Sequence, residues 1–334
     1  MSKSNVKGPI RLAPYDEKYL DATLQFLGRL NPDHPELGGK DLFLWQKCSR
    51  FLAIFKNNIV GHMAIIEQPF WSSAGRFTAG WGSALVLDTA NFALKTFAGV
   101  ALLDKCLDDF SYVYFGVGIV PEIEQSYLRK GYVICRNSVR MFARFFRPPK
   151  ALKYYEKPRI LSLPIMTMNI LRPAARFSDH LEHLTAFEEG TDALWAKLQK
   201  EQYNVYGERT ASFLNYKISQ PAKDYAILIH SQADEPDGYM IFRRARHNTK
   251  ELDIIKICDF VGSEVAKIRM ICEVLRIADE TGVDGVVALS SSRDKAIFNR
   301  AGMWLSIKYP IGLKPNFAGK MHLTFFDSDL DNLW

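Results

Sequence analysis

Two matching segments decide the fold of this chain. They are Tyr127-Leu128-Arg129-Lys130-Gly131-Tyr132 and Phe298-Asn299-Arg300-Ala301-Gly302-Met303. Each follows a strand-like apolar run and has the character of a short helix. Each ends in a glycine, Gly131 or Gly302, which suits the left-handed residue that closes many helices. The recurrence of this segment in the two halves predicts an internal duplication.

The predicted elements on either side of these segments repeat in the same order. Apolar spacing predicts for the first half a helix over 16–29, a hairpin of strands 50–55 and 59–66, a strand over 83–87, a helix over 97–109, a strand over 112–117, a helix over 121–130 and a strand to 146. For the second half it predicts a helix over 179–201, strands over 225–230, 238–243 and 252–260, a helix over 263–281, a strand over 285–289, a helix over 294–300, and strands near 305–309 and 322–326. The predicted class is mixed α/β, with two tandem domains of a mixed, mostly antiparallel sheet flanked by helices.

The stretch between the repeats has a different composition. Residues 147–176 hold five prolines and seven basic residues against one acid, Glu156. Proline removes a backbone donor and disfavours helix, so this stretch is predicted to be a linker or crossover. We expect its uncharged centre, residues 160–171, to pack between two domains, with contact to a membrane surface or a partner as the alternative. The predicted domains are therefore 1–147 and 177–334, joined by 148–176.

Composition limits the possible functions. A chain of 334 residues suits about two domains, and 48% hydrophobic residues exclude a disordered protein. The net charge of +6 is too small to predict DNA binding but is compatible with an anionic small ligand. Five scattered cysteines argue against a disulfide framework or a zinc cluster. No uninterrupted apolar run is long enough for a membrane span, and no secretory signal is evident, so we expect a cytoplasmic protein.

The segment around Tyr127 resembles the Y-x-x-x-G-F signature of the GNAT superfamily of N-acyltransferases. Ile59-Val60-Gly61-His62 is similar to that family's third strand. Both halves follow the family's element order, so the chain resembles tandem GNAT proteins, including uncharacterised members of bacterial polysaccharide-biosynthesis clusters. The resemblance implies two GNAT-like domains that transfer an acyl group from acetyl-CoA, or another acyl-CoA, to a primary amine. It suggests an amino sugar or a sugar-nucleotide precursor as the acceptor.

The resemblance also implies a cofactor slot in the first half. The family directs the backbone N–H groups of a loop between the fourth strand and the next helix at the pyrophosphate. The best match is Thr96-Phe97-Ala98-Gly99-Val100-Ala101, although threonine stands where the family has arginine or glutamine, and Lys95 would supply the charge. An ordinary helix start, with Thr96 as N-cap and Gly99 in close packing, is the alternative.

The pantetheine arm of the family enters a gap between the fourth and fifth strands. That gap would lie between Leu85, Val86 and Leu87 on one side and residues 112–117 on the other. The counterpart of the loop in the second half, residues 261–266, lacks the glycine pair and carries Glu264. We therefore do not expect the second half to hold coenzyme A.

By resemblance, Tyr127 is the general acid toward the sulfur of coenzyme A; the alternative is a ring that only packs beneath the strand. Phe298 occupies the matching place in the second half and cannot give a proton. Catalysis is therefore predicted for the first half, while the second half shapes the acceptor cleft or is structural. Asp88 and Glu67 are candidates for the base, or else solvated carboxylates at strand ends. His62 is expected to be a hydrogen-bonded structural histidine.

Two other functions stay open. The imperfect loop at 96–101 fits a catalytically inactive scaffold or sensor, and the basic residues from Lys150 to Arg159 fit a transferase that uses aminoacyl-tRNA. His180 and His183 have no third ligand nearby in the sequence, so no metal is expected. The expected partner is a small-molecule amine, without DNA or integral membrane association, and the protein is expected to be a monomer or a homodimer.

Overall fold

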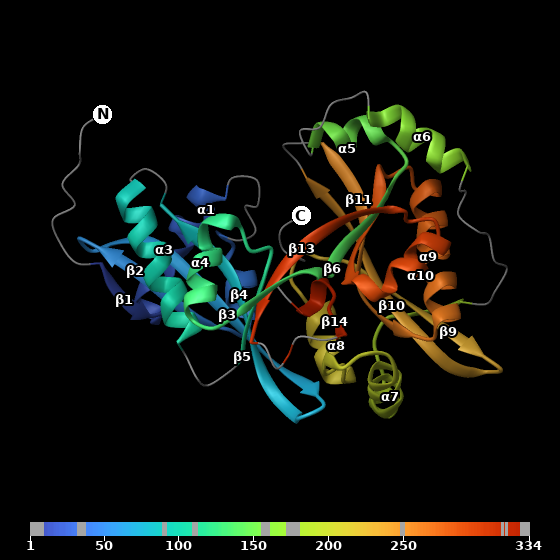
Figure 1. Cartoon of the computed structure of the whole chain (residues 1–334), viewed down its shortest axis with the longest axis horizontal. Helices are drawn as coiled ribbons and strands as arrows, with labels where there is room; N and C mark the ends of the chain where they lie inside the picture. The colour runs from blue at the N-terminus through green and yellow to red at the C-terminus, as the bar shows by residue number, and fades with distance from the viewer. Residues whose placement is uncertain are drawn as a thin grey trace.

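The computed structural model describes residues 10–31, 38–88, 92–108, 113–154, 161–171, 181–247, 251–314, 317 and 320–327. Its strands form one 14-stranded sheet in the order β1-β2-β3-β4-β5-β13-β6-β12-β11-β10-β9-β7, with β8 and β14 attached beside β3 (Figure 1). Helices cover both faces of this sheet, which confirms the predicted mixed α/β class.

The first half contains the elements that surround the first matching segment. They are β1 (Arg11–Pro14), α1 (Leu20–Leu30), α2 (Lys40–Trp45), β2 (Ser49–Phe55), β3 (Asn58–Ser72), β4 (Gly75–Leu87), α3 (Phe92–Leu107), β5 (Val113–Val117), α4 (Pro121–Arg129) and β6 (Val133–Phe145). Alternation along β2 places Leu52 and Ile54 in the core under α1 and α2, and Ala53 in the core under α3 and α4. The predicted hairpin turn is confirmed, with left-handed φ at Lys56 and Asn57.

The second half repeats this layering. Its elements are β7 (Leu181–Leu184), α7 (Asp192–Gln202), β8 (Val205–Gly207), α8 (Ala211–Ile218), β9 (Tyr225–Gln232), β10 (Glu235–His247), β11 (Leu252–Gly262), α9 (Glu264–Glu280), β12 (Gly285–Ser291), α10 (Lys295–Arg300), β13 (Leu305–Leu313) and β14 (Met321–His322). Ile227 and Ile229 face α7 and α8, whereas Leu228 between them faces α9 and α10.

The two halves exchange strands at the centre of the sheet. Strand β13 of the second half lies between β5 and β6, and β6 of the first half pairs with both β13 and β12. The order of elements is the same when the sheet is followed inward from β1 or from β7. The expected two sheets are thus joined as one, and hydrogen bonds between strands cross the boundaries predicted at residues 147 and 177.

The prediction that prolines keep residues 148–176 free of helix is wrong. The described part forms α5 (Pro148–Tyr154) and α6 (Ser162–Leu171). Pro148, Pro149 and Pro164 lie in first turns, where a missing N–H breaks no helical hydrogen bond. Figure 1 shows both helices over one end of the second half, away from α1 to α4. Packing between domains is therefore wrong for α6, whose Leu163 is 66% exposed.

Two predicted elements of the second half also differ from the structure. The helix expected over 179–201 is strand β7 followed by α7, which begins only at Asp192. β7 completes the sheet by pairing with β9, and Gly190, just before α7, disfavours a continuous helix. The strand expected over 322–326 is the two-residue β14 and a 3₁₀ turn, Phe325–Asp327.

Candidate active site

Strands β4 and β5 form a fork. They run parallel and pair only at Ala79–Val113, Gly80–Tyr114 and Trp81–Phe115. β5 continues beside β13, with Gly116 opposite Gly312. In the described part of the chain, no residue of β4 beyond Trp81 pairs with β5. The strands therefore diverge, and the predicted gap beside Leu85–Leu87 is confirmed.

A β-bulge lies on the β4 arm of the fork. The register with β3 shifts so that His62 pairs with Val86 and Ala64 with Ser83, which leaves one extra residue on β4. Ala84 within this segment has a left-handed φ of 45°. Bulges of this kind turn backbone groups away from the regular ladder and are common beside active sites. The bulge therefore redirects peptide groups of β4 where the neighbouring strand has left.

His62 holds the bulge in place. Its Nδ1–H donates a hydrogen bond to the carbonyl oxygen of Ala84 at 3.0 Å, which confirms the expected hydrogen-bonded histidine. Burial lowers the pKa of His62 to about 4, so the ring is neutral at ordinary pH. The buried Nε2 atom has no hydrogen-bond partner among the described residues. His62 therefore holds β4 by the hydrogen bond from Nδ1, and Nε2 takes no part.

Two phenol groups lie at the apex of the fork. The Tyr127 hydroxyl on α4 donates to the Tyr114 hydroxyl on β5 at 3.5 Å, the long end of a hydrogen bond. The Tyr114 hydroxyl occupies the space where residue 82 would carry a Cβ, and the Tyr127 hydroxyl does the same at residue 116. Gly82 and Gly116 therefore admit both hydroxyls to the backbone. The sequence analysis missed Tyr114, although glycines inside strands are a signal of such close approach.

The Tyr127 hydroxyl is protonated and buried. Its side chain is 2% exposed, and burial raises the pKa of its hydroxyl well above the ordinary value. The ring packs edge-on against Tyr132, with centroids 5.7 Å apart. The ring therefore does pack under the sheet, as in the alternative interpretation, but its hydroxyl meets Tyr114 at the fork. It is protonated at neutral pH, as an ordinary tyrosine is, and burial makes it a weaker acid than a free phenol.

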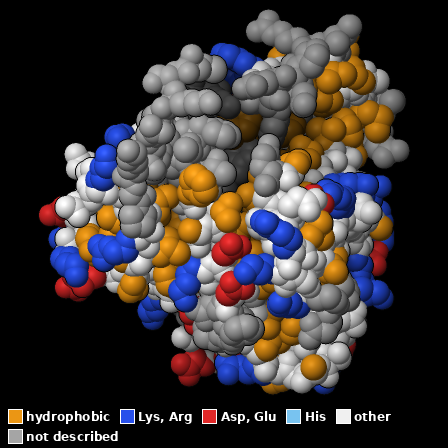
Figure 2. All heavy atoms as spheres, turned by 60° about the vertical axis from the view of Figure 1, so that its left-hand side comes forward, with side chains coloured by type: hydrophobic (Ala, Val, Ile, Leu, Met, Phe, Trp, Pro, Cys, Tyr) orange, Lys and Arg blue, Asp and Glu red, His pale blue; other side chains and the backbone are white. Residues whose placement is uncertain are grey.

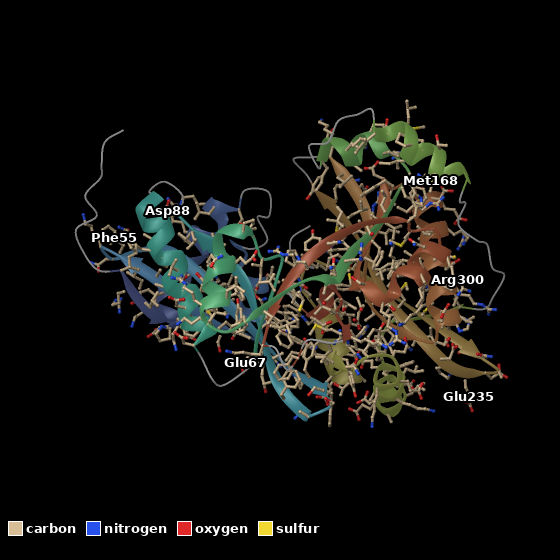
Figure 3. The ribbon with its side chains drawn as sticks, viewed as in Figure 1. Phe55, Glu67, Asp88, Met168, Glu235 and Arg300 are labelled. Carbon is tan, nitrogen blue, oxygen red and sulfur yellow. The ribbon has the colours of Figure 1, made fainter. Side chains whose placement is uncertain are left out.

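The two candidate bases lie at different ends of the sheet, as Figure 3 shows. Asp88 follows β4, pairs with Arg29 on α1 at 3.4 Å and lines a cleft of about 500 Å³. Glu67 on β3 is in register with Gly80, eight residues before Asp88, so at about 3.3 Å per residue the two are roughly 20 Å or more apart. Glu67 shares a register row with Gly80 and Tyr114, only two strand spacings from the fork.

The expected cofactor loop is part of a helix. Thr96–Ala101 lies inside α3, which begins at Phe92, so both the loop and the N-cap at Thr96 are wrong. The side chains of Lys95 and Thr96 and the whole of residues 89–91 lie outside the described residues. A Cβ on Gly99 would be 2.8 Å from Leu87 Cδ1, which confirms close packing of α3 on β4.

The remaining residues predicted for the slot have different environments. Ala98 is on the buried side of α3, whereas Phe97 and Val100 on the same helix are exposed. Leu85 and Leu87 are half-buried against the α3 core, and Val86 is half-buried against the α1 core on the opposite face. The end of β4 is therefore only partly covered.

The second half has a matching fork that is filled by the protein itself. β11 and β12 pair from Ile254–Gly285 to Ile257–Ala288 and then diverge. The Tyr203 hydroxyl donates to the Asp294 carboxylate at 2.9 Å and accepts from Lys267 Nζ at 2.9 Å. Burial lowers the pKa of Lys267. Residues 258–262 of β11 are all buried, in contrast to the half-buried end of β4.

A second buried polar cluster, missed by the sequence analysis, anchors the C-terminal residues 320–327. The Arg209 guanidinium donates to Asp259 at 2.9 and 3.0 Å and to Asp327 at 2.7 Å, and all three side chains are buried. His322 Nε2–H donates to the carbonyl oxygen of Phe260 on β11 at 3.0 Å. The cluster therefore ties the C-terminal segment to β11.

Among the residues that the structure describes, no group of three His, Cys, Asp or Glu side chains is placed to hold a metal ion. His183 lies on the edge strand β7, and His180 lies outside the described residues. None of the described helices has the length and apolarity required to cross a bilayer.

Comparison with known proteins gives structural likeness only. No protein-family model and no curated protein matches the sequence. A GCN5-related N-acetyltransferase from Anabaena variabilis has a TM-score of 0.54 at 14% identity, covering 90% of this chain and 72% of that chain. A conserved protein of unknown function from Enterococcus faecalis, described as a probable N-acyltransferase, has a TM-score of 0.61 at 8% identity, covering 91% and 72%. Saccharomyces cerevisiae N-myristoyltransferase with bound myristoyl-CoA has a TM-score of 0.58 at 11% identity, covering 91% and 82%.

These likenesses extend over nearly the whole chain. The protein therefore has the GNAT fold of these structures, and the predicted tandem GNAT-like architecture is confirmed. Identities of 8 to 14% show the fold alone.

Proposed function

We propose that this protein is an acyl-CoA-dependent N-acyltransferase whose reaction takes place at the fork of the first half. The observation that carries the proposal is the divergence of β4 from β5 after Trp81 and Phe115, beside the bulge at Ala84. The end of the β4 arm is half-buried, whereas the corresponding end of β11 is buried. The names of the similar structures, one of which contains myristoyl-CoA, support the same chemistry.

The chain supplies two groups suited to this reaction. Acyl-CoA would supply a thioester, whose carbonyl oxygen gains negative charge when an amine attacks it. We propose that backbone N–H groups beside the bulge, where the register of β4 with β3 shifts, would stabilise that charge once the ligand is bound. The Tyr127 hydroxyl, which meets Tyr114 at the fork, would protonate the departing sulfur. Tyr114 orients it by accepting its hydrogen bond.

For the base we propose Glu67 rather than Asp88. Glu67 lies in the register row of Tyr114, and Gly80 between them has no side chain to block the path. Its carboxylate accepts a hydrogen bond from Ser49 Oγ at 3.3 Å. At roughly 10 Å from the fork, a water molecule would relay the proton. Asp88 is paired with Arg29 at the far end of β4.

The placement of α3 revises the proposed cofactor contacts. Leu85, Val86 and Leu87 would border the pantetheine arm. The helix dipole of α3 acts at its start, Phe92, so the pyrophosphate is better placed there than beside Gly99. Lys95, one turn into the helix, remains the proposed cationic side chain near the phosphates.

The proposed acceptor is the primary amine of an amino sugar or of its nucleotide-linked form. The second half would form one wall of its cleft, and its position is fixed by a direct contact between α2 and α8. There the Trp45 ring stacks on Tyr216 at 4.6 Å, and the Tyr216 hydroxyl donates to the Trp45 carbonyl oxygen at 3.1 Å.

The test combines binding and turnover. Calorimetric titration with acetyl-CoA should show one site, and a thiol assay with a panel of amino sugars should show release of coenzyme A. Tyr127→Phe should lower turnover on the order of 10²-fold because it removes the proton donor. It should keep acetyl-CoA affinity within about threefold, since the ring packing is retained.

Two results would contradict the proposal. If acetyl-CoA does not bind at millimolar concentration, the protein is a scaffold with the fold but without the cofactor. If binding occurs and Tyr127→Phe turns over like the wild type, Tyr127 has no part in the chemistry. A Leu128→Ala variant, which removes an exposed side chain from the same helix, serves as the matched control.

A further inference from the structure

Helix α6 exposes an apolar surface. Leu163 is 66% exposed, Met166 47%, and Leu161 just before the helix 44%. Residues 160–171 contain no charged side chain. A helix that is apolar on all sides is ordinarily buried, but this one lies on the outside of the second half. Figure 2 shows hydrophobic side chains gathered at the top of the molecule, where α6 lies.

The exposed helix is held firmly by the sheet. The Asn169 side chain donates from Nδ2 to the carbonyl oxygen of Phe145, at the end of β6, at 2.7 Å. Arg144 Nη2 donates to the carbonyl oxygen of Asn169 at 3.3 Å. Because these bonds fix one side of α6 on β6, its opposite side faces solvent in a defined orientation.

Positive charge surrounds this apolar helix along the chain. Residues 147–176 contain a single acid, Glu156, and seven basic residues: Arg147, Lys150, Lys153, Lys157, Arg159, Arg172 and Arg176. Lys150 and Lys153 are exposed on α5, which lies beside α6 in Figure 1. An apolar centre with cations on both sides is the pattern of a helix that lies in the headgroup layer of an anionic membrane.

We propose that α5 and α6 form a docking surface for an anionic phospholipid membrane. Leu161, Leu163 and Met166 insert among the acyl chains, while Lys153 contacts the lipid phosphates; Lys150 is already paired with the buried Asp284 at 3.4 Å. Charge decides between this occupant and a second copy of the chain. A symmetric dimer through α6 would bring two strongly basic segments face to face, whereas an anionic membrane neutralises them.

This surface is separate from the fork, so the proposal goes beyond the proposed function and does not rest on it. It is tested by flotation of the full chain with vesicles of phosphatidylcholine containing about one third phosphatidylglycerol. Binding is expected to these vesicles, to weaken as salt is raised, and to be much weaker on phosphatidylcholine alone.

Three variants separate the apolar and the charged contributions. Leu163→Asp and Met166→Asp should each lower partitioning about tenfold, because a carboxylate replaces an inserted apolar group. Lys153→Glu should lower binding about tenfold on anionic vesicles and leave binding to neutral ones unchanged. The matched control is Val265→Asp, which adds the same charge at a residue 48% exposed in the first turn of α9, and it should bind like the wild type.

Several outcomes would overturn the proposal. Wild-type protein that does not float with anionic vesicles at low salt removes the membrane as the partner. A dimer in light scattering that Leu163→Asp converts to a monomer assigns α6 to a second copy instead. Equal loss in the Val265→Asp control shows a general charge effect. Thermal unfolding by circular dichroism checks that each variant remains folded.

Discussion

At the scale of single residues, Ala84 carries the clearest backbone strain in the first half. Its left-handed φ of 45° within a strand costs an L-residue about 1 kcal/mol. The hydrogen bond from His62 to the Ala84 carbonyl oxygen helps to maintain this conformation. A strained residue kept at the arm of a fork is consistent with a functional reason for the bulge.

The strain at Ala84 gives a prediction that contrasts two substitutions. Ala84→Gly should change the free energy of unfolding by less than about 1 kcal/mol, because relief of strain offsets the greater freedom of the unfolded chain. Ala84→Val should destabilise by roughly 1–3 kcal/mol and weaken acetyl-CoA binding, since a β-branched residue resists left-handed φ. Urea denaturation and calorimetry measure both effects. Equal stability of the two variants would contradict the assignment of strain.

The low pKa of His62 in the folded state predicts that the protein loses stability in acid. Its folded pKa is about 4, against 6.5 for a free histidine, so below pH 6.5 the unfolded state binds a proton that the folded state does not. The free energy of unfolding should therefore fall as pH drops from 6.5 to 4, by roughly 3 kcal/mol for this residue. His322, also lowered to about 4 by burial, adds a similar dependence.

The variant His62→Asn isolates the contribution of His62. Asparagine keeps an N–H donor near the position of Nδ1 but does not titrate. Urea denaturation at pH 7 and near pH 4.5 should show a smaller decline for the variant than for the wild type. An unchanged decline would assign the acid sensitivity to other groups.

At the scale of elements, the exchange of β6 and β13 makes each half depend on the other. Without β13, the described β5 and β6 lose the strand that joins them, and the second half loses β6 from beside β12. Residues 1–154 or 181–334 expressed alone should therefore not unfold cooperatively, whereas the two fragments refolded together should regain one transition. Circular dichroism melting provides the measurement. An independently stable fragment would show that the shared strands are dispensable.

Strand β13 also connects the second half to the proposed acid. A Cβ on Gly312 would lie 2.5 Å from Ile119 Cδ1 and 2.6 Å from the Tyr127 ring. Gly312→Val should displace Tyr127, lower turnover about tenfold or more and cost roughly 1–3 kcal/mol of stability. Gly190→Val, where nothing lies within 4 Å, is the matched control and should have normal turnover. Turnover should be compared at equal folded fraction.

Local sequence signals predicted an element correctly where its formation did not depend on contacts with residues distant in the sequence. Asn57 marked the hairpin turn, and Gly131 took the expected left-handed φ after α4. The start of α3 was misplaced because Gly99 was interpreted as a loop residue, whereas it is a contact with Leu87. Strand exchange lay beyond prediction, because it depends on pairings between residues about 170 apart in the sequence.

Only part of the site was predicted, because its other features also depend on pairings between distant residues. The motif around Tyr127 identified the hydroxyl, and the family order identified the gap between β4 and β5. Tyr114, the bulge at Ala84 and the distance between Glu67 and Asp88 depend on register across three strands. A single sequence carries no record of register, so these features required the structure.

At the scale of the whole molecule, the two halves share one architecture but differ at the fork. The first fork is bordered by the half-buried end of β4, and the second is filled by Tyr203, Lys267 and Asp294. This difference supports the proposal that the first half binds the ligand and the second half supports the fold.

If the first half binds the cofactor and the second half supports the fold, one variant should lower stability without lowering acetyl-CoA affinity. Lys267→Met leaves Asp294 buried without its cation at 3.6 Å and should cost about 3 kcal/mol in the free energy of unfolding. Acetyl-CoA affinity should stay within about twofold, because the proposed cofactor site lies in the first half. Calorimetry at a temperature where the variant is fully folded makes the comparison. A large loss of affinity would place the cofactor in the second half.

The outer strands of the continuous sheet have a consequence for the behaviour of the protein in a crowded solution. β1 and β7, which end the strand order, are only four residues long, and β1 closes with Pro14. Edge strands this short, one of them ending in a proline, offer another polypeptide few backbone N–H and C=O groups with which to pair. A wide β-structure can in this way resist the edge-to-edge pairing from which fibrils grow.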